Sequence, residues 1–188
     1  RFIRQAAFVC FARRGFAATT MDDIRRESRA SIGSIYHHFA NKERLAQRLF
    51  VEGLRDYQQG LLAELDRVGR RSRSPRGMAK RGVFVVVEHY LDWVAMNRDW
   101  ARYLLELGQS PVVEELKAEV EAMNAHFYEA LAQRFQPHIE RKVLVRLPMS
   151  LYAAILIGPA RDFARHWLTA EDDSIHGARR VLAEAAWK

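Results

Sequence analysis

The chain has 188 residues, of which 49% are hydrophobic and 28% are charged, proportions that are typical of a soluble globular protein with a sizeable core. Its longest apolar run, Leu151–Gly158, is far shorter than the roughly 20 residues that a membrane-spanning helix needs. The net charge is +7, and residues 1–50 hold ten Lys and Arg against four Asp and Glu, which indicates a nucleic-acid partner rather than a merely solvated surface.

An amphipathic helix is predicted over Arg1–Arg14, because apolar residues recur there at the spacing of one helix face. Gly15 is expected to end this helix. Cys10, the only cysteine, lies on the apolar side and is expected to pack in a core. A single cysteine excludes an intramolecular disulfide and suits a reducing compartment, so we expect a cytoplasmic protein. A small core is expected from Phe16, Ile24, Ile35, Phe39 and Leu45.

Two short helices joined by a tight turn are predicted next, over Met21–Glu27 and Ile32–His38. Thr20 and Asp23 have the spacing of a capping box, in which each side chain bonds the backbone amide of the other residue. Ser31 is placed to cap the second helix. This arrangement is typical of a helix-turn-helix, a DNA-binding motif.

The outward face of the second short helix is predicted to be small, polar and aromatic. Ile35 and Phe39 lie four residues apart and anchor the opposite side. A face without acids, carrying short or planar side chains, suits a helix that enters the major groove of DNA. Ile32 lies at the edge of this face and is placed to touch a thymine methyl group. The positions on the face are Gly33, Ser34, Tyr36 and His37.

A long helix is predicted from Lys42 to about Val68, with Asn41 as its cap. The free amides at its start and the Lys42 ammonium together suit one DNA phosphate. Because this helix starts in one core and ends in another, we expect the domain boundary inside it, near Ala46–Gly53. The predicted domains are a DNA-binding domain of residues 1–47 and a ligand-binding and dimerisation domain of residues 48–188.

Residues 15–28 and 31–45 resemble the DNA-binding region of the TetR family of bacterial transcription regulators, and residues 3–16 resemble its first helix. The family often has Gly in the turn between the two short helices, where this chain has Ser28, Arg29 and Ala30. A left-handed conformation at Arg29 costs on the order of 1 kcal/mol, and its charge would add a phosphate contact. The matching positions are Thr20, Gly33, Ser34, Ile35, Tyr36, Phe39, Asn41, Lys42 and Glu43.

The resemblance implies a protein that reads a palindromic operator in double-stranded DNA. Two half-sites about 34–36 Å apart require two recognition helices and hence a homodimer. The side chains expected to contact phosphates are Thr20, Arg29, Tyr36, His38 and Lys42. The residues expected to read bases are Ile32, Gly33, Ser34 and His37.

The rest of the chain is predicted to be helical, apart from a solvated connection at Gly69–Gly77. No strand alternation is present, so the predicted fold class is all-α. We expect a three-helix helix-turn-helix domain joined by a long helix to a C-terminal helical bundle, about nine helices in all. The further predicted helices are Met78–Asn97, Asp99–Leu107, Pro111–Gln136, Pro148–Leu168 and Ile175–Trp187.

Two sets of side chains are candidates for sites in the C-terminal bundle. Small residues on the last two helices permit close approach, and the resemblance implies that these helices pair with a twofold mate; packing within the chain is the alternative. The resemblance also implies that aromatic residues line a small-molecule pocket, with an ordinary core as the alternative. The dimerisation set is Ala153, Ile157, Ala160, Ala164, Ala178, Val181, Leu182 and Ala185. The ligand set is Trp93, Trp100, Tyr103, Met123, Phe127, Tyr152 and Phe163.

These patterns predict a sequence-specific transcriptional regulator, a repressor that a small-molecule effector releases. We expect no metal, cofactor or catalytic residue, because no histidine pair has ligand spacing and no nucleotide-binding loop or nucleophile motif is present. Asp162 and His166, four residues apart, come nearest to an acid–base pair. Two alternatives remain open: a helical enzyme or ligand carrier with a basic end, and a DNA-binding protein without an effector.

Overall fold

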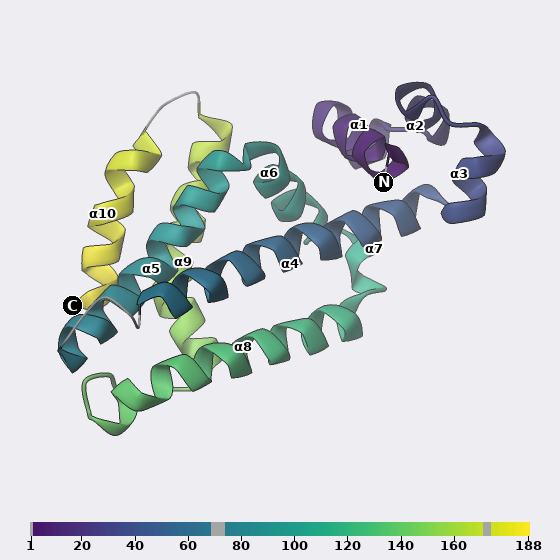
Figure 1. Ribbon diagram of the computed structural model, residues 1–188. Helices are drawn as coiled ribbons and strands as arrows, with labels where there is room; N and C mark the ends of the chain where they lie inside the picture. Colours follow the sequence, from purple (N-terminus) through teal and green to yellow (C-terminus); the bar gives the residue numbers. More distant parts are fainter. Residues whose placement is uncertain (1, 69–73, 171–173) are drawn as a thin grey trace. The chain divides into compact units, whose positions relative to one another are not determined.

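The computed structural model describes residues 2–68, 74–170 and 174–188, and this part of the chain forms ten α-helices and no strand (Figure 1). The prediction of an all-α fold is confirmed. None of the described helices is both long and apolar enough to cross a lipid bilayer. The helices are α1 (Phe2–Ala18), α2 (Met21–Ser28), α3 (Ile32–His38), α4 (Lys42–Val68), α5 (Pro75–Met96), α6 (Arg98–Leu107), α7 (Pro111–Glu114), α8 (Lys117–Glu140), α9 (Met149–Thr169) and α10 (Ser174–Trp187).

Helix α1 continues past Gly15. This glycine has φ 76° and ψ 163°, so regular helical geometry is interrupted there, and a further turn follows as far as Ala18. The Thr19 hydroxyl lies 2.8 Å from the carbonyl oxygen of Gly15 and 3.2 Å from that of Cys10. The shorter distance marks the Gly15 carbonyl, at the interruption, as the better acceptor for the single hydroxyl hydrogen. Gly15 thus ends the regular part of the helix, but not the element.

Helix α5 begins earlier than the sequence predicts. The Ser74 side chain accepts a hydrogen bond from the Gly77 amide at 3.0 Å, and Pro75 occupies the first turn. A serine cap followed by proline favours a helix start, so the end of the predicted connection Gly69–Gly77 is helical. The first part of that connection, residues 69–73, lies outside the described residues.

The helix predicted over Pro111–Gln136 is two helices, and a buried side chain bonds the backbone carbonyl at the point where they separate. Nε2 of Gln47 donates a hydrogen bond to the carbonyl oxygen of Val112 at 2.8 Å. In a continuous helix the Leu116 amide would donate to that oxygen. The Leu116 amide donates instead to the carbonyl oxygen of Val113, at 2.8 Å. The chain therefore turns between α7 and α8.

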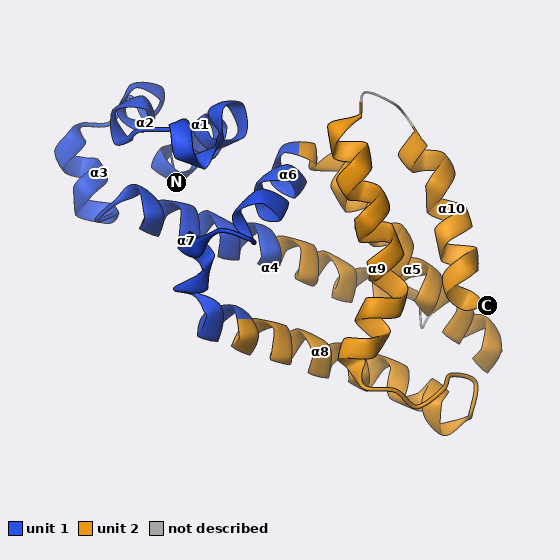
Figure 2. Cartoon of the chain, turned by 180° about the vertical axis from the view of Figure 1, so that it is seen from behind, with its two compact units in different colours: residues 1–55, 99–120 blue, residues 56–98, 121–188 orange. Residues whose placement is uncertain are grey.

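Packing divides the chain into two compact units (Figure 2). Unit 1 comprises Arg1–Arg55 and Asp99–Val120, and unit 2 comprises Asp56–Arg98 and Glu121–Lys188. Unit 1 thus contains most of α6 and all of α7 besides the first three helices, and α4 contributes to both units. The functional division at residue 47 stays a prediction, since these units are defined by packing alone.

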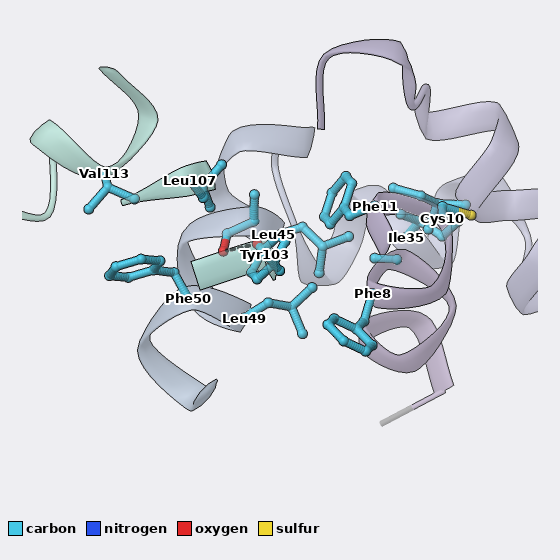
Figure 3. Packing of buried hydrophobic residues seen from close by; sticks show 13 residues of the cluster. Phe8, Cys10, Phe11, Ile35, Leu45, Leu49, Phe50, Tyr103, Leu107 and Val113 are labelled. Atoms are coloured by element: carbon cyan, nitrogen blue, oxygen red, sulfur yellow. Dashed lines mark hydrogen bonds between the residues drawn. The ribbon is translucent and has the colours of Figure 1, made fainter. Parts of the chain in front are cut away.

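The core of unit 1 joins the helix-turn-helix to the first part of α4 (Figure 3). Ile24, Ile35 and Leu45 are buried in it, and Cys10 is buried with them. The partly buried rings of Phe16 and Phe39 pack against this cluster. The small core predicted from the sequence is therefore confirmed.

Helix α6 supplies two aromatic side chains to the same core. The Trp100 ring stacks on the Phe8 ring with centroids 3.9 Å apart, and the Tyr103 hydroxyl donates to the carbonyl oxygen of Ala46 at 2.8 Å. Gly53 permits the close approach of Trp100 to α4, because a Cβ atom there would lie 2.7 Å from Cε3 of the indole ring. Burial raises the pKa of Tyr103 far above its ordinary value, so its hydroxyl remains a donor.

Unit 2 is built around α5, which packs against α9 and α10 and carries a buried run of valines. Polar contacts attach the second part of α4 to its neighbours in this unit. Nε1 of Trp93 on α5 donates to the carboxylate of Asp56 at 2.9 Å, and Nε2 of Gln58 donates to the side-chain oxygen of Asn124 on α8 at 2.9 Å. Within unit 2, α4 is therefore held by both α5 and α8.

Candidate nucleic-acid interface and neighbouring sites

Helix α2 begins with the predicted capping box. Oγ1 of Thr20 accepts a hydrogen bond from the Asp23 amide at 3.1 Å, and the Asp23 carboxylate accepts from the Thr20 amide at 2.9 Å and from the Thr20 hydroxyl at 2.7 Å. These hydrogen bonds hold the pKa of the Asp23 carboxyl below its ordinary value. The Thr20 hydroxyl, which the sequence assigns to a phosphate, already donates within this cap.

The turn between α2 and α3 contains a left-handed residue that is not glycine. Arg29 has φ 56° and ψ 17° and ends α2. The Ser28 hydroxyl accepts a hydrogen bond from the Ala30 amide at 3.3 Å, which closes the turn. The side chain of Arg29 is exposed to solvent, so its guanidinium is accessible to a phosphate.

Replacing Arg29 with glycine is expected to stabilise the fold. Glycine adopts the left-handed conformation without a side-chain clash, so Arg29→Gly should raise the free energy of unfolding by about 1 kcal/mol. Thermal unfolding measures the change. Arg29→Ala is the matched control, because it removes the same charge but keeps a Cβ atom. Equal unfolding temperatures for the two variants would contradict this account.

Helix α3 presents the exposed face that the sequence predicts. Ile35 is 0% exposed, whereas Ile32 is 44% and Tyr36 is 51% exposed. The Ser31 side chain accepts a hydrogen bond from the Ser34 amide at 3.1 Å and so caps the helix. The remaining exposed positions of α3 are Gly33, Ser34, His37 and His38. None of the residues of α3 is acidic, so the face offers donors and small apolar groups without repelling phosphate.

Helix α4 starts where the sequence predicts, but its first side chain, that of Lys42, is bonded within the protein and not directed to solvent as a phosphate contact would require. Oδ1 of Asn41 accepts a hydrogen bond from the Arg44 amide at 2.8 Å, which confirms the predicted cap. The Lys42 ammonium lies 2.8 to 3.3 Å from three backbone carbonyl oxygens at and after the end of α1. It therefore faces the protein in this structure. The sequence carries no local signal for this placement, since the acceptors precede Lys42 by more than twenty residues.

The acidic side chains at the start of α2 are paired with arginines. Asp22 lies 2.8 Å from Nε of Arg25, and Asp23 lies 2.9 Å from a guanidinium nitrogen of Arg14. Arg26 contacts both carboxylates, at 3.0 and 3.2 Å. Exposed pairs of this kind stabilise a fold little. They do neutralise acids in the segment that carries the basic excess.

The predicted ligand residues divide between the two units. Trp100 and Tyr103 belong to the core of unit 1. Trp93 is buried in unit 2, where its ring nitrogen is bonded to Asp56. The set is therefore divided between two cores, and its role in ligand binding stays a prediction. The half-buried members in unit 2 are Met123, Phe127, Tyr152 and Phe163.

A pocket of about 220 Å³ in unit 2 has a different lining. Its polar members are Asp66, Arg134 and His138, and two hydrogen bonds of 2.8 and 2.9 Å join the first two. Burial lowers the pKa of His138, and Arg141 adds to the effect, so the neutral imidazole is favoured. The apolar lining consists of Leu65, Val68, Met78, Gly82 and Phe135.

The predicted dimerisation residues lie partly in the core of unit 2 and partly on its surface. Ala160 and Ala164 are fully buried within the chain, so their small size serves intrachain packing. Val181 is 66% exposed on α10. The sequence analysis missed two exposed apolar residues of α9, Leu151 and Ile155, whose spacing of four places them on one helix face. Of the other predicted members, Ala185 is exposed and those that are half-buried are Ala153, Ile157, Ala178 and Leu182.

Comparison with known families places the first part of the chain. Residues 3–49 match the family described as bacterial regulatory proteins, tetR family. The HTH-type transcriptional repressor KstR2 of Mycolicibacterium smegmatis is 32% identical over 123 residues, which cover 63% of this chain and 58% of that protein. KstR2 of Rhodococcus jostii is 28% identical over 113 residues, which cover 60% and 55%. The chain thus spans less than two thirds of the length of these relatives.

Solved structures resemble the chain over its whole length. The transcriptional regulator FadR from Bacillus subtilis, in complex with stearoyl-CoA, has a TM-score of 0.79 at 19% identity, covering 100% of this chain and 97% of that chain. FadR from Bacillus halodurans, a fatty acid degradation regulator, has a TM-score of 0.77 at 15% identity, covering 99% and 93%. At these identities the similarity shows a common fold.

Proposed function

We propose that this chain is a member of the TetR family of bacterial regulatory proteins, whose model matches residues 3–49, and that it is a sequence-specific DNA-binding repressor of transcription. The observation that carries the proposal is the face of α3. Ile32 and Tyr36 are exposed there although they are large and apolar or aromatic, and no acid lies among them. A helix with such a face, backed by a buried Ile35, suits the major groove of DNA.

We assign the contacts by the chemistry of each exposed side chain. Arg29, Tyr36 and His38 offer donors to backbone phosphates and so fix the register of the protein on the duplex. Thr20 is exposed at the start of α2, and it can contact a phosphate only if its hydroxyl or amide exchanges the Asp23 carboxylate for that phosphate. The residues assigned to base edges are Ile32, Gly33, Ser34 and His37.

We propose further that the repressor acts in the cytoplasm as a homodimer, joined through the exposed apolar face of α9 and α10, and that a small molecule in unit 2 releases it from DNA. The exposed apolar side chains of Leu151 and Ile155 on α9 and of Val181 on α10 support the dimer, because exposed apolar surface of this kind marks interaction sites. The FadR neighbour that holds stearoyl-CoA makes fatty acyl-CoA the first class of effector to test.

His37→Ala is expected to relax base preference while leaving general DNA binding intact. A duplex selected by the purified protein from a random pool serves as the specific site, and a scrambled duplex as the reference. One lost base contact should weaken binding to the selected duplex by about 10- to 100-fold and leave the scrambled duplex nearly unaffected. Fluorescence anisotropy at fixed salt measures both, and stearoyl-CoA enters the same assay as a candidate releasing ligand.

His126→Ala is the matched control for this experiment, because His126 is an exposed histidine of α8 in unit 2. It should bind both duplexes as the unmodified protein does. Equal losses on the selected and scrambled duplexes for His37→Ala would contradict the assignment of base reading. A pool from which no sequence is enriched would contradict sequence-specific binding as such.

A further inference from the structure

All three hydrogens of the Lys42 ammonium have acceptors inside unit 1. Nζ lies 2.9 Å from the carbonyl oxygen of Phe16, 3.3 Å from that of Ala17 and 2.8 Å from that of Thr19. It also lies 4.4 Å from the centroid of the Phe16 ring, within range of a cation–π interaction. A lysine ammonium has three donors and no more. With these bonds in place, none remains for a phosphate.

The three acceptors lie where α1 ends and α2 is about to begin. The last carbonyls of a helix lack amide partners within it, and a positive charge is favoured there. Thr19 precedes Thr20, the cap of α2, and its carbonyl is the last of the three. A single ammonium therefore serves both as the C-terminal cap of α1 and as a support for the start of α2.

The two residues joined by this contact, Thr19 and Lys42, flank the helix-turn-helix in the sequence. Thr19 stands immediately before its first cap, and Lys42 is the first residue of α4, immediately after the segment that contains α3. The bond from Lys42 to Thr19 thus closes a loop around α2, the turn and α3. The buried side chain of Ile35 fixes how far α3 enters the core, whereas the bond from Lys42 fixes the two ends between which α3 is held.

We propose that Lys42 is a positioning residue that holds the two ends of the helix-turn-helix together and sets the orientation of α3, rather than a residue that contacts a DNA phosphate. This inference rests on the proposed function of α3 as the DNA-reading helix. Its physical basis, the closed loop from Thr19 to Lys42, exists in the free protein and can be tested there.

The first test needs no DNA. Hydrogen exchange of the α3 amides is compared between the unmodified protein, Lys42→Met and Lys42→Arg. Both variants should exchange the α3 amides about tenfold faster or more, because hydrogen bonds to a charged group are lost and the loop opens. Arginine keeps the charge, but its planar guanidinium cannot direct three hydrogens at three converging carbonyls. Exchange in α8, which lies mostly in unit 2, should stay unchanged and serves as the internal reference.

The second test measures binding to a scrambled duplex as a function of salt. A residue that contacts one phosphate contributes about 0.9 to the slope of log K against log salt concentration. Lys42→Met should weaken binding while keeping the slope, and Lys42→Arg should weaken it as well. Arg29→Ala, which removes an exposed arginine of the same unit, should instead lower the slope by about 1.8 for the proposed homodimer, about 0.9 for each protomer, without faster exchange in α3.

The outcomes separate the inference from the function on which it rests. Unchanged α3 exchange in both Lys42 variants, or a Lys42→Arg protein that binds like the unmodified one, would overturn the positioning role. A slope lowered by about 1.8 in the Lys42→Met homodimer, about 0.9 for each protomer, would assign Lys42 to a phosphate. If the Lys42 variants exchange their α3 amides faster while the unmodified protein binds no duplex at all, the positioning role is upheld and the proposed function is refuted instead.

Discussion

Ile35→Ala is expected to lower the free energy of unfolding of unit 1 by about 2–5 kcal/mol. DNA binding should be lost under milder denaturing conditions than in the unmodified protein. Ile35 is 0% exposed and is the buried anchor of α3, so the truncation leaves a cavity in the core that carries the helix. Because α3 is only seven residues long, it has little stability apart from this anchor. Chemical denaturation followed by far-ultraviolet circular dichroism measures the loss.

Ile32→Ala is the matched control, since it is the same substitution one turn earlier in the same helix. Ile32 is 44% exposed, and substitutions at such positions usually change stability by less than about 0.5 kcal/mol. The control should therefore fold like the unmodified protein but bind its selected duplex more weakly. If the two substitutions lowered stability equally, the assignment of buried and exposed faces of α3 would be wrong.

The double variant Ile155→Glu/Val181→Glu is expected to be a monomer that binds a palindromic duplex about 10²- to 10⁴-fold more weakly. The two side chains are 47% and 66% exposed on α9 and α10, so charges there should not disturb the fold of the chain. In the proposed dimer the same positions would bring like charges together in an apolar interface. A monomer reads one half-site, so it loses the gain from simultaneous binding.

Size-exclusion chromatography with light scattering measures the oligomeric state, and anisotropy measures binding. Met96→Glu supplies the control, because Met96 is 78% exposed and belongs to α5, not to either of the two helices of the proposed interface. It should remain a dimer with unchanged affinity. A double variant that stays dimeric, or an unmodified protein that is monomeric at micromolar concentration, would show that this face is not the dimer interface.

The sequence predicted local features of the fold well, because their causes are local. The capping box of Thr20 and Asp23 and the caps of Ser31 and Asn41 each depend on residues a few positions apart. The burial of Ile35 follows from helical spacing alone. These features are also the ones that build the candidate DNA-binding surface.

The features that the sequence did not predict depend on contacts between distant residues. Gln47 donates a hydrogen bond to the carbonyl of Val112, sixty-five positions along the chain, at the place where one expected helix is divided into two. Trp100 has the pattern of a pocket residue, but its partner is Phe8 in another helix. The periodicity of α6 contains no information about which neighbouring helix will cover it, so the sequence did not predict that Trp100 and Tyr103 belong to the core of unit 1.

The candidate DNA-binding part of this protein depends on side chains of α6. Trp100 stacks on Phe8, and the Tyr103 hydroxyl donates to the carbonyl oxygen of Ala46. A fragment that ends after α4 would lack the α6 side chains that cover Phe8, and would expose apolar surface to water. An isolated unit 1 therefore has to combine two separate segments of the chain, residues 1–55 and residues 99–120.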